Sequence, residues 1–97
     1  MTLEVPIKGK ISGGPYSRLD AIKIILRRIR RHSHSVPEPY RFWIQKAELA
    51  LHFLNYSTSG TSFYGKLKVS NHVGLKRCKD KVLGYINEVF GKIGFTT

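Results

Sequence analysis

The stretch KIILRRIRRH, residues 23–32, gathers five side chains that are suited to binding phosphate: Lys23, Arg27, Arg28, Arg30 and Arg31. A guanidinium group presents a planar fork of N–H donors that can bond two oxygens of one phosphate, and lysine adds a point charge. On a helix these residues share one broad side, where only Asp20 supplies a negative charge. Like charges four positions apart repel by roughly a few tenths of a kcal/mol. The clustering therefore favours a polyanionic partner.

Two other interpretations of this stretch stay open. It could be the solvated side of an ordinary helix, or RRIRRH could be a short nuclear-import signal. Ile24 lies among the basic residues, so either a partner contacts it or another part of the chain covers it.

Two further groups of basic residues could extend the contact with an anion. The first group consists of two K-x-K pairs on the polar sides of two expected strands: Lys8, Lys10, Lys66 and Lys68. If the strands pair, the four lysines share one sheet face, which an anion would neutralise; plain edge protection by lysine is the alternative. The second group opens an expected helix, where cations oppose the helix dipole: Lys76, Arg77, Lys79 and Lys81.

Tyr64 lies on the same side of its expected strand as Lys66 and Lys68. An aromatic ring beside lysines on an open sheet can stack on unpaired bases, although packing across strands is the commoner role of such a residue.

Catalytic and metal-binding patterns are absent from the sequence. His32, His34, His52 and His72 lack zinc spacing with the single cysteine, and no Ser-His-Asp constellation can be assembled. Cys78 lies on an apolar helix side and is expected in the core. We therefore expect no enzyme activity, no metal and no cofactor.

Length and composition point to one basic domain spanning residues 1–97. The net charge is +11 and apolar residues make up 41% of the chain, enough for a single core. One cysteine suggests a reducing compartment. No apolar run reaches the roughly 18–20 residues of a membrane span, and the N-terminus lacks the order of a signal peptide. We expect a protein of the cytoplasm, the nucleus or the interior of a virion.

Hydrophobic periodicity places these residues on a small set of elements. Alternation predicts strands over 2–11 and 62–69, and helical spacing predicts helices over 17–32, 39–54 and 74–90, the last with a Gly91 cap. The order β-α-α-β-α indicates an α+β fold, a small antiparallel sheet packed against three helices. Because two strands make a weak sheet, a third strand within 55–64, or a partner chain, is expected to complete it. An open edge also makes a homodimer or higher oligomer plausible.

The order of these parts resembles the core of rhabdovirus-type matrix proteins. The matching pieces are LEVPIKGKI, YSRLDAIKIIL, EPYRFWIQKAELALHFL and FYGKLKV, a match of architecture and spacing without a diagnostic motif. The chain is much shorter than is usual in that family and lacks its long basic N-terminal tail and its PPxY motif. The resemblance implies a viral protein that self-assembles, binds anionic membrane and condenses nucleoprotein.

The residues themselves favour a small non-enzymatic protein that binds nucleic acid or nucleoprotein through phosphate contacts, largely without regard to sequence. Assembly at an anionic membrane is the first alternative. It is less favoured because the 17–32 helix has only Ile and Leu at its apolar border, whereas surface-lying helices usually place Trp or Phe there. An adaptor or inhibitor for an acidic protein is the second alternative.

Overall fold

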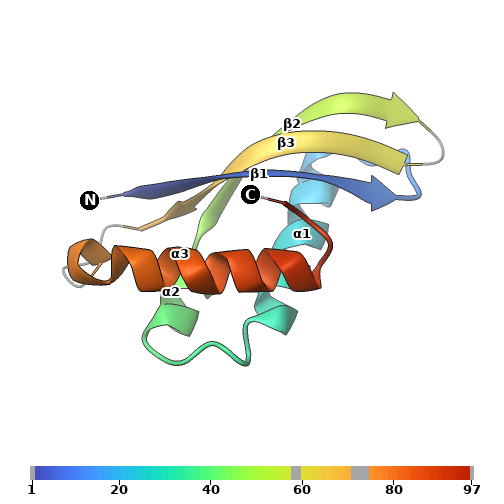
Figure 1. Cartoon of the computed structure of the whole chain (residues 1–97). Helices are drawn as coiled ribbons and strands as arrows, with labels where there is room; N and C mark the ends of the chain where they lie inside the picture. Colours follow the sequence, from blue (N-terminus) through green and yellow to red (C-terminus); the bar gives the residue numbers. More distant parts are fainter. Residues whose placement is uncertain (1, 58–59, 71–74, 97) are drawn as a thin grey trace.

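The computed structural model describes the backbone of residues 2–57, 60–70 and 75–96; the side chains of residues 54–57 and of Lys76 lie outside this description. The elements are β1 (Leu3–Ser12), α1 (Arg18–His32), α2 (Tyr40–Gln45), β2 (Glu48–Ser57), β3 (Gly60–Val69) and α3 (Leu75–Lys92). The predicted α+β class is confirmed. The three strands form an antiparallel sheet in the order β1-β3-β2, and all three helices lie on one side of it (Figure 1).

Strict alternation builds the two faces of the sheet. In β1 the side chains of Leu3, Val5 and Ile7 are buried, whereas those between them are exposed. In β3 Phe63 and Leu67 point the same way and are fully buried. These residues form one apolar core with the buried sides of the helices. The opposite face of the sheet carries no helix (Figure 1).

The predicted helix over residues 39–54 is wrong in its second half. Only Tyr40–Gln45 is helical, and Glu48–Ser57 forms β2, the third strand, which pairs with β3. The segment 48–53 alternates as a strand does: Leu49 and Leu51 are buried, and Ala50 and His52 are exposed. Pairing satisfies the second edge of β3 from within the chain, so the sheet needs no partner chain for its third strand. The segment EPYRFWIQKAELALHFL is therefore part helix and part strand.

Helix α1 begins as its sequence predicts. The side chain of Ser17 caps the helix by accepting a hydrogen bond of 3.1 Å from the backbone N–H of Asp20. Its buried stripe consists of Ala21, Ile25 and Ile29, which belong to the common core. With this stripe against the core, the basic side of the helix faces outward.

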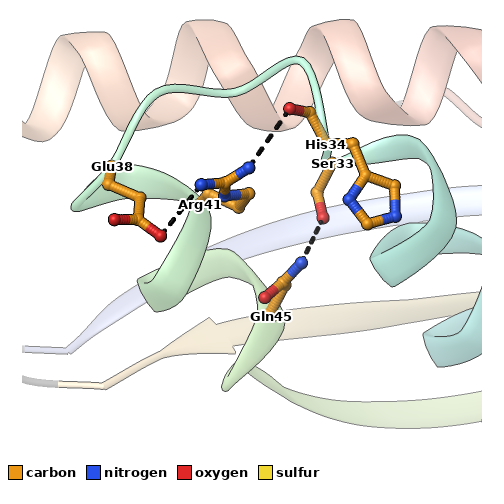
Figure 2. A network of polar contacts seen from close by, with 5 residues as sticks. All are labelled: Ser33, His34, Glu38, Arg41 and Gln45. Carbon is orange, nitrogen blue, oxygen red and sulfur yellow. Dashed lines mark hydrogen bonds and ion pairs between the residues drawn. The ribbon is translucent and has the colours of Figure 1, made fainter.

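A polar network holds the end of α1 against α2 (Figure 2). The fully buried Ser33 donates its hydroxyl to the carbonyl of Arg30 at 2.9 Å and accepts a hydrogen bond from Gln45 Nε2 at 3.0 Å. Arg41 bridges the loop by pairing with Glu38 at 2.9 Å and donating to the carbonyl of His34 at 3.4 Å. These contacts hold the C-terminal end of α1 in position against α2.

The glycine that caps helix α3 lies three residues beyond the predicted one. The helix runs through Gly91 to Lys92, and Gly94 adopts the left-handed conformation, with φ +81°. The N–H of Phe95 then donates to the carbonyl of Phe90 at 2.9 Å, and that of Gly94 donates to Gly91 at 3.3 Å. This double hydrogen bond is a Schellman motif.

The residues after this turn pair with one stretch of the outer edge of β1. Phe95 is buried against Phe63, with ring centroids 5.1 Å apart, and Thr96 exchanges two backbone hydrogen bonds with Lys8, of 2.8 and 2.9 Å. Position 9 must be glycine for this packing, because a Cβ atom there would overlap the Phe95 ring. The last residues therefore cover one stretch of an otherwise open strand edge.

Candidate nucleic-acid interface

The first candidate surface is the outward side of α1, here called the helix surface and made of Lys23, Arg27, Arg28, Arg30 and Arg31. Four of these side chains are exposed, and that of Arg28 is half-buried. The structure therefore brings together all five residues that the sequence predicts for this site. Side chains on neighbouring turns of one helix lie within reach of a single extended anion.

The helix surface keeps its positive charge uncompensated. Among the described residues, none of its five side chains forms an ion pair; the four ion pairs that this part of the chain contains lie elsewhere. Arg30 makes one weak contact, from Nε to the carbonyl of Gln45 at 3.5 Å. Free guanidinium groups at this density are a ready phosphate-binding surface.

Two small hollows lie between these basic side chains. One, of about 160 Å³, is lined by Ile24, Arg27, Arg28 and Arg31, and the other, of about 350 Å³, by Lys23, Leu26, Arg27 and Arg30. The side chain of Ile24 is half-buried and packs against the core. The rest of the chain thus covers much of Ile24, and the remainder forms an apolar patch between arginines.

The second candidate surface is the helix-free face of the sheet, here called the sheet surface and made of the outward side chains of β1, β2 and β3. The strands β1 and β3 pair as predicted, and the four lysines of the two K-x-K pairs share this face. They do not oppose one another across the strands, because Lys8 stands opposite Tyr64, Lys10 opposite Ser62, and Lys66 opposite Pro6. The register therefore avoids the direct repulsion expected from facing lysines.

Two glutamates reduce the charge at one end of the sheet surface. Lys68 stands between Glu4 on β1 and Glu48 on β2. The carboxylate of Glu4 lies 3.7 Å from Lys66 Nζ and 3.8 Å from Lys68 Nζ. The opposite end holds Lys8 and Lys10, which make no ion pair among the described residues. The positive potential of the face is thus strongest toward Lys10.

An aromatic pair stands in the middle of the sheet surface. His52 of β2 stacks on Tyr64 of β3, with ring centroids 5.1 Å apart and planes inclined by 26°. Tyr64 remains 48% exposed despite this contact. The sequence did not predict His52 on this face, because residue 52 falls in the predicted second helix. The alternation of residues 48–53 is the signal that places His52 on the sheet surface.

The two surfaces lie on opposite sides of the sheet. Helix α1 packs against the face of the sheet that carries the core (Figure 1). The register and the burial pattern place the four lysines on the other face. The expectation that the strand lysines extend the basic patch of the helix is therefore wrong in its geometry. The helix surface and the sheet surface are therefore separate from each other.

Helix α3 carries the third predicted group of basic residues. Arg77, Lys79 and Lys81 are exposed, whereas the side chain of Lys76 lies outside the described residues. The helix has a kink at Cys78, with φ −111° and ψ 15°, so the basic residues flank an irregular turn. Cys78 packs against the core, as predicted, and accepts a hydrogen bond from the Tyr40 hydroxyl at 3.7 Å.

Over residues 2–57, 60–70 and 75–96, no helix combines the length and apolar character needed to cross a membrane. In the same part of the chain, no three His, Cys, Asp or Glu residues come together as a metal site would require.

Comparisons of the chain with protein-family models, with curated proteins and with solved structures found no match.

Proposed function

We propose that this chain is a non-enzymatic protein that binds nucleic acid or nucleoprotein through phosphate contacts, largely independently of base sequence. The observation that carries the proposal is the helix surface, where five basic side chains crowd one side of α1 without an ion pair among the described residues. Such a density of unpaired charge costs the free protein stability by self-repulsion. A phosphate backbone removes that cost when it binds.

The anchoring of α1 supports a rigid binding surface rather than a mobile basic tail. Its opposite side is locked into the core by Ala21, Ile25 and Ile29, and its end is held by the Ser33 network. Because the backbone of α1 is already held in place, binding does not also have to order this segment, and less of the energy of the phosphate contacts is lost. Arginine, the main component of this surface, also bonds phosphate through two N–H groups at once.

A side-by-side binding titration tests the proposal. The probes are fluorescent single- and double-stranded RNA and DNA, together with anionic and neutral lipid vesicles, each measured at several salt concentrations. We expect binding to nucleic acid whose logarithm of affinity falls linearly with the logarithm of salt concentration, with a slope that counts the phosphates neutralised.

Two results would contradict this function. Binding confined to anionic vesicles would support the alternative of an assembly protein at a membrane surface, to which each clustered Lys or Arg adds about 1 kcal/mol. Absence of binding to every probe would support an acidic protein as the partner.

A further inference from the structure

We propose that the sheet surface binds the unpaired bases of a single-stranded nucleic acid, with the stacked rings of Tyr64 and His52 as its platform. This inference rests on the nucleic-acid binding proposed above and names the form of the polymer. It is carried by the sheet surface and not by the helix surface, so the two can be tested separately.

The open face of the sheet presents an aromatic stack that the core does not need. Tyr64 and His52 point away from the apolar core, and about half of the tyrosine surface is accessible. A base can extend such a stack by packing on an outer ring face. Every base has a flat π-face, so this contact does not depend on sequence.

The register leaves room for a base beside this stack. The neighbouring cross-strand row is Pro6–Lys66–Ala50, in which two of the three side chains are short. A groove of about 660 Å³ lies over this row. Pro6, Ala50, Tyr64 and His52 line it together with the charged side chains of Glu4, Lys8, Lys66 and Lys68. A hollow that joins an aromatic pair and short apolar side chains to lysines fits a stacked base and its phosphate.

Cations surround the platform where the flanking phosphates would lie. Lys8 stands directly across from Tyr64, Lys66 follows two residues along the same strand, and Lys10 lies in the next row. Lys8 and Lys10 form no ion pair in the described part of the chain. The acidic end, at Glu4 and Glu48, lies on the far side of Lys66. The groove lies between the row of Lys8 and the row of Glu4, so the phosphate nearest the stacked base would contact Lys8 and Lys66. The strand would then continue toward Lys10, away from Glu4 and Glu48.

Stacking on a protein ring selects for unpaired bases. In a duplex the bases stack on one another and expose only their edges in the grooves, so a flat platform cannot reach their faces. A single strand can splay its bases onto aromatic side chains while its phosphates contact lysine. The combination on the sheet surface therefore suits a single strand of RNA or DNA.

The test compares affinities of full-length variants for single-stranded RNA, single-stranded DNA and the corresponding duplexes at fixed salt. Tyr64→Leu keeps an apolar side chain but removes the ring, and Tyr64→Phe keeps the ring. We expect Tyr64→Leu to weaken single-strand binding by roughly 5- to 150-fold and to leave duplex binding nearly unchanged. Tyr64→Phe should bind as the wild type does. His52→Leu is a second, independent variant and should show the same selective loss.

Each outcome has a defined meaning, provided that urea unfolding shows the variants to be folded. Equal losses for single strands and duplexes, no loss for single strands, or a Phe variant as weak as the Leu variant would overturn the inference. In those cases salt-dependent binding by the wild type would leave the proposed function standing. A wild type that binds neither single strands nor duplexes would overturn both.

Discussion

The imidazole of His52 stacks on the phenol of Tyr64 at a centroid distance of 5.1 Å, joining β2 to β3 on the face that the helices leave open. The pair is separated from the basic side of α1 by the sheet and the core. One surface offers arginine-rich charge and the other offers aromatic rings among lysines. A polymer that uses both must wrap around the molecule, or two strands must be bound at once.

Glu4→Gln should strengthen binding of a single-stranded oligonucleotide. The carboxylate of Glu4 lies 3.7 and 3.8 Å from the ammonium groups of Lys66 and Lys68. Its replacement leaves both cations unpaired and removes a negative charge that repels phosphate. We expect a gain in affinity of about two- to five-fold, measured by fluorescence anisotropy. The ion pairs are solvent-exposed, so stability should change by less than about 1 kcal/mol.

Glu88→Gln is the matched control for this variant. Glu88 pairs with Lys92 at 3.6 Å near the end of α3, so its substitution makes the same change in net charge at an exposed residue that belongs to neither surface. An affinity gain as large as that of Glu4→Gln would show that net charge alone, and not the sheet surface, sets the affinity.

Much of the fold follows from local patterns in the sequence, and the exception has a physical cause. The strands β1 and β3 and the helices α1 and α3 lie within a few residues of their predicted bounds, because each has a clear period and marked ends such as the Ser17 cap. Residues 40–57 are apolar on nearly every side of a helix and contain no Gly or Pro at the switch from α2 to β2. The alternation of residues 48–53 is also compatible with a strand, and pairing with β3, a tertiary effect, decides between the two patterns.

Ser33→Ala should destabilise the junction between α1 and α2. The hydroxyl bonds both the Arg30 carbonyl and Gln45 Nε2, and Ser33 has no solvent exposure (Figure 2). We expect a loss of about 1–3 kcal/mol in the free energy of unfolding, measured with urea. In a Gln45→Leu background the same substitution should cost less, because one of its two partners is already absent. An identical cost in both backgrounds would contradict the described hydrogen bond.

Gly9→Ala should destabilise the wild type and be tolerated better when the ring of Phe95 is removed. A Cβ atom at position 9 would overlap that ring, which is buried against Phe63. Phe95→Ala alone should cost about 3–5 kcal/mol, as for other buried phenylalanines. The double-mutant cycle, measured by urea unfolding, should show strong coupling. Additive costs would mean that the chain end does not pack under β1.

Tyr40→Phe should flatten the alkaline loss of stability. The hydrogen bond to the Cys78 sulfur, together with burial, raises the pKa of Tyr40 above its usual value of 10.0. The folded state thus keeps a proton that the unfolded chain loses as the pH rises. The contribution of Tyr40 to the free energy of unfolding is therefore full below pH 10.0 and declines as the pH rises beyond it. Urea midpoints across that range should fall less steeply in the variant. Equal slopes would contradict the described contact.

The candidate site was predictable where it depends on one helix and not where it depends on the sheet. The five basic residues of the helix surface share a side of α1 because helical geometry alone dictates it. The relation of Lys8 to Tyr64, the pairing of Glu4 with two lysines, and the approach of His52 all depend on strand register. Register is set by long-range pairing, which one sequence does not display.

The most direct test of the central claim is a salt titration of nucleic-acid binding by Arg27→Glu with Arg31→Glu. Singly, Arg27→Glu is compared with Lys46→Glu, an equal charge change at an exposed residue that forms no ion pair among the described residues. We predict that the double variant loses duplex binding almost completely, with circular dichroism and melting temperature nearly unchanged, and that Lys46→Glu has little effect. A double variant that binds normally while folded, or that fails to fold, would contradict the assignment of α1 as the phosphate-binding element.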